Sequence, residues 1–235
     1  MLNQGVIFDG DDTLWRTEQL YDDARSRIRK IVSETGIDGS DWERLERKLD
    51  VENVATLGFG VDRFPTSCIQ AYEELCHRSG TQIDALISSQ VREAAVSPFK
   101  RDPAVVPGAL ETLISLRSQG VRLALLSKGV LKLQLRRIKA SGLASYFDTI
   151  KIVTEKTPDV IRDVLSTLRV KPELAWMVGN SIRSDILPAL TAGIHVIWIE
   201  SHTWEYERAL DHLVDSRVVV AQNVTEVPKL ISRQV

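Results

Sequence analysis

From about residue 104 onward, short apolar runs alternate with segments of helical periodicity. Strands are expected at 121–126, 149–153, 174–178 and 194–199, and helices at 109–119, 130–141, 158–168 and 186–192. This alternation predicts a parallel sheet with helices on both faces, because parallel strands are joined by crossovers that are usually helical. An earlier apolar run, Val6-Ile7-Phe8, predicts one more buried strand. We therefore expect an α/β fold.

Residues 15–103 follow a different pattern, which is helical and rich in charge. No convincing strand occurs there, and segments 36–41 and 58–60 mark breaks between helices, with Ser40 or Asp41 as the candidate N-cap. A segment with three prolines, 98–108, separates this region from the alternating pattern. We therefore expect two domains, a core of residues 1–14 and 104–235 and an inserted helical domain of residues 15–103.

Charge and composition exclude several classes of protein. The 235 residues carry 30 Lys and Arg against 32 Asp and Glu, with 43% apolar residues. The two signs are interspersed, which argues against a nucleic-acid or membrane-surface partner. No apolar stretch approaches the length of a membrane span, and the start of the chain lacks the pattern of a signal peptide. Cys68 and Cys76 suit buried reduced thiols, so a cytoplasmic location is expected. The sequence does not indicate an oligomeric state.

Three polar clusters follow predicted strands. They are Asp9-Gly10-Asp11-Asp12-Thr13, Ser127-Lys128-Gly129, and the segment from Gly179 to Asp185. Ligand sites of parallel sheets lie at the carboxyl ends of the strands, so the three clusters are expected to meet. Each cluster alone also has an ordinary structural interpretation, such as a solvated turn or a helix cap.

The residue types suit phosphoryl transfer. Asp9 and Asp185 place carboxylates where a cation is needed to neutralise them, and Mg²⁺ prefers oxygen ligands. A carboxylate can act as a covalent nucleophile, and a second carboxyl can serve as acid and base. A hydroxyl and a positive charge are needed for the phosphoryl oxygens, and Ser127 and Lys156 supply these types.

The chain resembles the haloacid dehalogenase superfamily, in particular its phosphatase branch with a helical cap. Four segments carry the resemblance over essentially the whole chain: Val6 to Leu14, Leu125 to Gly129, Lys156 within Glu155-Lys156-Thr157-Pro158-Asp159, and Val178 to Asp185. Their order and spacing agree with the four family motifs. The resemblance implies a Rossmann-like core, and the insert resembles the cap that covers the site.

The resemblance implies roles in catalysis and metal binding. Asp9 is the expected nucleophile and a metal ligand. Asp11 is the expected general acid and base, with its backbone carbonyl on the metal. Asp185 anchors the expected Mg²⁺. Asn180 is a departure, because the family usually has an acid there and an amide oxygen carries no charge.

The resemblance also implies contacts with substrate. Ser127 and the amide of Lys128 are expected to bind phosphoryl oxygens. Lys156 neutralises the nucleophile and the phosphate, and Thr13 orders the first loop. Trp15, directly after that loop, is a candidate contact with the substrate.

The expected protein is thus a Mg²⁺-dependent phosphatase that hydrolyses a small phosphorylated metabolite through an aspartyl phosphate. A dehalogenase on the same fold remains open, although a leaving halide needs no proton and Asp11 therefore favours phosphate. A phosphomutase also remains open, as does a non-catalytic phosphate-binding or regulatory protein. The sequence does not identify the substrate.

Overall fold

The computed structural model describes residues 4–201, 203–208 and 215–232. The chain divides into two compact units, here called the sheet unit (Met1–Arg16 with Pro103–Val235) and the helical unit (Thr17–Asp102). These boundaries differ by two residues and by one residue from those expected at 15 and 103. The reason is a pairing between segments far apart in the chain: β2 (Trp15–Arg16) pairs antiparallel with β3 (Ala104–Val105), so Trp15 and Arg16 belong with the sheet unit. The expectation of no strand from Trp15 onward was therefore wrong at its first two residues.

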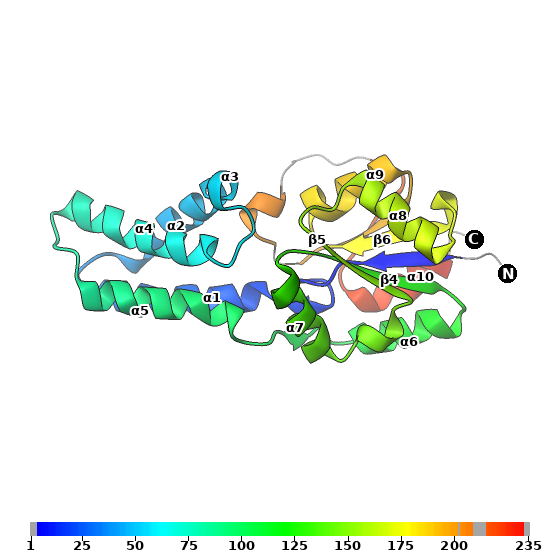
Figure 1. The fold of residues 1–235 in the computed structure, drawn as a ribbon, viewed down its shortest axis with the longest axis horizontal. Helices are drawn as coiled ribbons and strands as arrows, with labels where there is room; N and C mark the ends of the chain where they lie inside the picture. Colours follow the sequence, from blue (N-terminus) through cyan, green and yellow to red (C-terminus); the bar gives the residue numbers. More distant parts are fainter. Residues whose placement is uncertain (1–3, 202, 209–214, 233–235) are drawn as a thin grey trace. The chain divides into compact units, whose positions relative to one another are not determined.

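A parallel sheet forms the centre of the sheet unit (Figure 1). Among the described residues it has six strands in the order β5-β4-β1-β6-β7-β8, and each neighbouring pair is parallel. The strands are β1 (Gly5–Phe8), β4 (Arg122–Lys128), β5 (Thr149–Val153), β6 (Ala175–Gly179), β7 (His195–Ile199) and β8 (Val218–Ala221). The predicted α/β class is confirmed. β8 was not predicted, although its run of three valines carried the signal.

Helices cover both faces of this sheet. One face has α6 (Ala109–Ser118), α7 (Leu131–Ser141) and α10 (Val227–Ser232), and the other has α8 (Pro158–Leu168) and α9 (Leu187–Ala192), as Figure 1 shows. Alternate residues of β1 divide between the two cores: Val6 and Phe8 pack on the first face, and Ile7 packs on the second. All of β1 is buried, as expected for a strand with neighbours on both sides and helices on both faces.

The helical unit contains α1 (Glu18–Ser33), α2 (Gly39–Glu52), α3 (Val54–Leu57), α4 (Arg63–Ser79) and α5 (Ala85–Val96), followed by a 3-10 turn at Ser97–Phe99. Asp38 rather than Ser40 or Asp41 caps α2, because its extended backbone lets its carboxylate accept a hydrogen bond from the Ser40 amide at 2.7 Å. Trp42, Phe64 and Tyr72 are fully or almost fully buried in the core of this unit.

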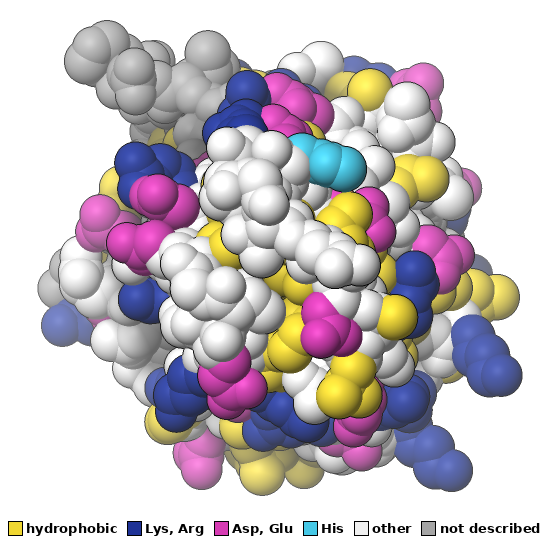
Figure 2. Space-filling view, turned by 90° about the vertical axis from the view of Figure 1, so that its left-hand side faces the viewer, with side chains coloured by type: hydrophobic (Ala, Val, Ile, Leu, Met, Phe, Trp, Pro, Cys, Tyr) yellow, Lys and Arg dark blue, Asp and Glu magenta, His cyan; other side chains and the backbone are white. Residues whose placement is uncertain are grey.

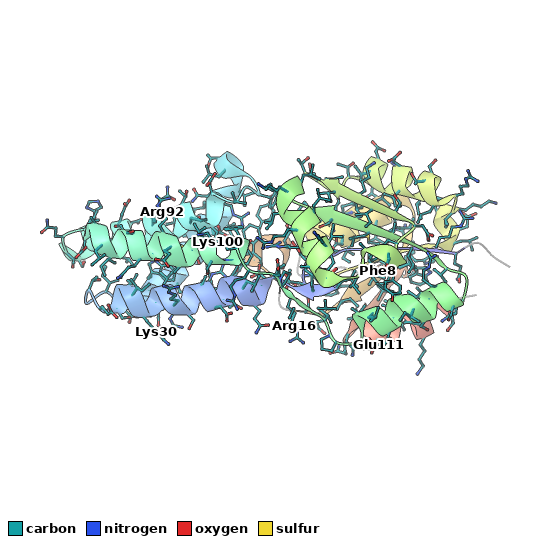
Figure 3. All side chains as sticks on the ribbon, turned by 60° about the horizontal axis from the view of Figure 1, so that its bottom comes forward. Phe8, Arg16, Lys30, Arg92, Lys100 and Glu111 are labelled. Atoms are coloured by element: carbon teal, nitrogen blue, oxygen red, sulfur yellow. The ribbon has the colours of Figure 1, made fainter. Side chains whose placement is uncertain are left out.

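Charged side chains occur both outside and inside the helical unit. Lys30 on α1 and Arg92 on α5 are exposed (Figure 3). Arg25 is buried and donates from Nε to Glu46 Oε2 at 2.9 Å. Each buried ion is thus held with an opposite charge, which is what burial of charge normally requires.

A second buried pair lies in the same unit. Arg63 donates from Nε to Asp50 Oδ1 at 2.9 Å, and the Ser67 hydroxyl donates to the same oxygen at 3.3 Å. Each buried cation of this unit therefore has a buried anion as partner within the same unit.

Three further expectations concern the two cysteines, membrane-spanning helices and the distribution of surface charge. Cys68 and Cys76 both lie in α4 as buried free thiols, as predicted. No helix in the part of the chain that the structure describes is long and apolar enough to cross a membrane. On the face that Figure 2 shows, acidic and basic side chains are interspersed.

Candidate functional site

The first cluster forms a tight loop at the carboxyl end of β1. The Asp9 amide donates to Val178 O of β6 at 2.8 Å, which fixes the start of the loop against the neighbouring strand. The Leu14 amide then returns to Gly10 O at 2.8 Å. A side chain at residue 10 could not fit, because its Cβ would lie 2.3 Å from the Trp15 ring. The loop therefore holds Asp9 directly after the central strand β1, and it requires glycine at residue 10.

Lys156 joins the first cluster, Asp9 to Thr13, and the third cluster, Gly179 to Asp185. Its ammonium donates to Asp9 Oδ1 and to Asp185 Oδ1, the latter at 2.7 Å, and all three side chains are buried. Burial raises the pKa of Asp9 to about 8; Lys156 acts against this rise, whereas Asp185 and Asp11 add to it. Burial alone would lower the pKa of Lys156, but Asp185 and Asp9 raise it above its ordinary value. Lys156 is thus the ammonium shared by two buried carboxylates.

Ser127 lies near the end of β4, the strand that pairs with β1. It is 1% exposed, and its Oγ has no hydrogen-bond partner among the described residues. A buried hydroxyl without a partner costs about 1–3 kcal/mol, so an isolated one in a packed core needs an explanation. A ligand oxygen that hydrogen-bonds to Ser127 provides one.

The third cluster, Gly179 to Asp185, follows β6. The Ser181 hydroxyl accepts from the Ser184 amide at 2.8 Å, and a turn of π-helix over Ile182–Ile186 precedes α9. The Ser181 amide donates to Asp185 Oδ2 at 3.0 Å, which orients this carboxylate toward Lys156. Asn180 is 7% exposed, and its Oδ1 accepts from the Thr13 hydroxyl at 3.4 Å. Thr13 and Asn180 therefore link the first and third clusters.

Lys128 has a partner that the sequence did not reveal. Its ammonium donates to Glu207 and to the Ser184 hydroxyl, and Glu207 also accepts from Ser181. Burial would raise the pKa of Glu207, but Lys128 and the two hydroxyls outweigh burial and lower the pKa. Glu207 lies in a 3-10 turn at Glu205–Arg208, far along the chain from any motif. The predicted contact of the Lys128 amide with phosphate stays a prediction.

Asp11 is held by three side chains, two of which, Gln134 and Arg137, were missed. Trp15 Nε1 donates to Asp11 Oδ1 at 2.6 Å, and two residues of α7 donate to Oδ2: Gln134 Nε2 at 2.9 Å and Arg137 Nη1 at 2.7 Å. Gln134 and Arg137 are polar residues three apart on the helix that follows the second cluster, and this spacing was the signal that could have found them. Trp15 is fully buried beside Asp11. Its predicted contact with substrate stays a prediction.

The donor set at these strand ends fits Mg²⁺. When Asp9 and Asp185 are both ionised, their two negative charges exceed the one ammonium that they share, and the predicted set adds neutral oxygens from Asn180 and the Asp11 carbonyl. Among the described residues, no three His, Cys, Asp or Glu side chains are grouped to hold a metal. Such a group is not needed here, because the predicted set takes two side-chain carboxylates, one amide and one backbone oxygen.

Comparison with known proteins gives one family. The model of the haloacid dehalogenase-like hydrolases matches residues 4–193. A glyceraldehyde 3-phosphate phosphatase of Methanothermobacter thermautotrophicus is 26% identical over 97% of this chain and 99% of its own. A phosphoserine phosphatase of Thermus thermophilus is 32% identical over 47% of this chain and 46% of its own.

A solved structure supports the same fold. The haloacid dehalogenase-like hydrolase of Xanthomonas campestris superposes with a TM-score of 0.78 at 26% identity, over 99% of this chain and 96% of that one. The region matched by the family model contains the three polar clusters and Lys156.

Proposed function

The chain belongs to the haloacid dehalogenase-like hydrolase family, and from this premise we propose that it is a Mg²⁺-dependent phosphatase of small phosphate monoesters. The observation that carries the proposal is the arrangement of Asp9, after β1, with Lys156 and Asp185, together with the unpartnered hydroxyl of Ser127 on the neighbouring strand β4. A phosphoryl group needs a nucleophile, a cation and hydrogen-bond donors at one place, and these residues supply them. Two relatives named as phosphatases support the same reaction class.

The proposed reaction has two steps. A carboxylate oxygen of Asp9 attacks phosphorus, the bond from phosphorus to the leaving oxygen breaks, and Asp11 gives that oxygen a proton. Water then attacks the aspartyl phosphate, Asp11 takes the proton of the water, and the bond from phosphorus to Asp9 breaks. Inorganic phosphate leaves and both carboxyl groups return to their starting states.

Cation chemistry supports the first step. Phosphatases of this family generally use Mg²⁺. Bound at Asp9, Asp185, Asn180 and the Asp11 carbonyl, it would balance the excess carboxylate charge and the charge of the phosphate. Lys156 keeps Asp9 oriented, and Ser127 with the Lys128 amide holds phosphoryl oxygens.

The helical unit is proposed as the cap that selects the substrate, with a small phosphorylated metabolite as the partner. Relatives are named for different substrates, a triose phosphate in one case and phosphoserine in another, so the substrate class stays broad. We also propose a cytoplasmic location, which the two free buried thiols support.

The test is to measure phosphate release from a set of phosphate monoesters. The set includes triose phosphates, phosphoserine, phosphoglycolate, nucleotides and p-nitrophenyl phosphate. We expect phosphate release that needs Mg²⁺ and stops in chelator. Borohydride added during turnover should reduce the acyl phosphate and convert Asp9 to homoserine, which mass spectrometry of the peptide detects. Asp9→Asn is the matched control and should yield no such product.

Two results would contradict the proposal. Halide release from 2-haloacids without phosphatase activity would identify a dehalogenase. Binding of phosphate esters without turnover, in wild type and Asp9→Asn alike, would identify a non-catalytic protein.

A further inference from the structure

We propose that Gln134 and Arg137 of α7 are positioning residues that hold the carboxyl of Asp11, the acid and base of the proposed reaction. Both side chains are buried, at 2% and 3% exposure, and both donate to the same oxygen, Asp11 Oδ2. The inference rests on the proposed function, because Asp11 needs a defined position only if it transfers a proton.

The orientation of Gln134 gives the first argument. Its Nε2 donates to Asp11 Oδ2 at 2.9 Å and to the Lys128 carbonyl at 2.8 Å. Both partners are acceptors, so the amino group must face them and the amide cannot be turned over. As a result Oε1 is buried without a hydrogen-bond partner in the described part of the chain, at a cost of about 1–3 kcal/mol. A side chain that leaves its acceptor unpaired is held for the sake of its two donor contacts.

The location of these contacts gives the second argument. Gln134 joins Asp11 to the backbone at the end of β4, the strand that carries Ser127, so the acid and the expected phosphate-binding segment are fixed to one helix. A Cβ at residue 129 would lie 2.9 Å from Gln134 Nε2, so the glycine at this position leaves the room that the amide occupies.

The charge of Arg137 gives the third argument. Its Nη1 lies 2.7 Å from Asp11 Oδ2; the Arg137 side chain is 3% exposed and the Asp11 side chain is 27% exposed. Ion pairs contribute little net stability, both at the surface and when buried, whereas their direction can fix one geometry. Trp15 holds Oδ1 from the other side at 2.6 Å. The carboxyl plane of Asp11 is thereby set by donors on both of its oxygens.

The test separates proton transfer from folding by changing the leaving group. An alkoxide needs a proton from Asp11 in order to leave, whereas p-nitrophenolate leaves without one. Arg137→Met and Gln134→Met are compared with wild type on p-nitrophenyl phosphate and on the alkyl phosphate that wild type turns over fastest. Lys139→Met is the matched control, because it removes an exposed cation from the same helix.

We expect kcat/KM of both variants to fall about 100-fold on the alkyl ester and less than about threefold on p-nitrophenyl phosphate. Hydrolysis of the phosphoenzyme also depends on Asp11, because Asp11 activates the water. The aryl ester should therefore give a burst of nitrophenolate followed by slow turnover. The phosphoenzyme should accumulate and be recovered after an acid quench. Arg137→Lys, which retains the charge, should recover part of the alkyl rate. Lys139→Met should behave as wild type.

Equal losses on both esters without a burst would overturn the inference and leave Arg137 and Gln134 as structural residues. The ratio of the two rates does not depend on the fraction of folded enzyme, so a poorly folding variant still gives a decisive result. Absence of turnover by wild type on every ester would instead overturn the proposed function, and with it this inference.

Discussion

Both units bury charged side chains, but in opposite manners. In the helical unit, Arg25 with Glu46 and Arg63 with Asp50 form pairs of one cation and one anion. In the sheet unit, two carboxylates that follow neighbouring strands share the single ammonium of Lys156.

Buried charge alone therefore does not identify a functional site. What distinguishes the sheet unit is that two buried carboxyl groups share one ammonium, since a bound cation would balance the excess charge. In the helical unit each buried cation has a buried anion, and these pairs are expected to specify the packing of α1, α2 and α4. The comparison predicts that changes in the sheet unit reduce activity and changes in the helical unit reduce stability.

The largest effect is expected for Asp9→Asn. Loss of the nucleophile should reduce kcat by at least about ten-thousand-fold, because a covalent route supplies many orders of magnitude. Stability should be equal to or higher than that of wild type. The pKa of Asp9 is about 8 in the folded chain and about 3.8 in the unfolded chain, so its ionisation opposes folding increasingly as pH rises between these values. Thermal unfolding from pH 5 to 8 measures this, and a large loss of stability at pH 8 would remove the contrast between the units.

Asp50→Asn tests the buried pairs of the helical unit. The substitution leaves Arg63 buried without its full anionic partner, so unfolding of the helical unit should become easier by about 3–5 kcal/mol. Asp41→Asn is the control on the same helix, because Asp41 pairs with Arg44 at the surface and should cost less than about 1 kcal/mol. Urea unfolding of the full chain monitored by circular dichroism compares them. Equal effects of the two substitutions would show that burial does not matter here.

Glu207→Gln tests the ion pair with Lys128 inside the sheet unit. The neutral amide retains one acceptor but loses the charge opposite Lys128, which should cost about 1–2 kcal/mol at pH 7. The folded pKa of Glu207 is lowered, so its contribution is complete above the unfolded value of about 4.5 and is lost as pH falls through the folded value. The difference in melting temperature between wild type and variant should therefore shrink toward pH 4. A difference that grows on acidification would contradict the ion pair.

The smallest effect is expected for Asn180→Asp. A carboxylate adds charge to the proposed metal site, and the Mg²⁺ concentration for half-maximal activity should fall about three- to tenfold. Repulsion from Asp9 and Asp185 acts in the other direction, but a divalent cation is the larger local charge. A Mg²⁺ titration of both proteins with one substrate measures the shift. An unchanged titration would mean that Asn180 does not bind the metal.

The sequence predicted those site residues that lie in or next to a segment whose own pattern indicates a strand. Asp9, Ser127 and the segment that leads to Asp185 follow apolar runs that predict buried strands, so their meeting at one sheet edge was expected from the fold class. Glu207 could not be found in this way, because nothing local to residues 205–208 indicates that they lie against Ser181. Trp15 was placed with the insert because its pairing with Val105 joins residues 90 apart. Long-range contacts of this kind are set by tertiary packing.

The position of β1 in the sheet has a consequence for the order of assembly. Its four residues pair with Arg122–Leu125 on one side and with Ala175–Val178 on the other, so both partners lie far along the chain. The helical unit closes within one contiguous segment, and domains of local contacts form faster than those that must first close long loops. In a chain made from its N-terminus, Asp9 is the first of the candidate site residues to be synthesised and among the last to be placed. A nascent chain that ends before Ala175 therefore contains Asp9 but lacks one of the two strands that pair with β1.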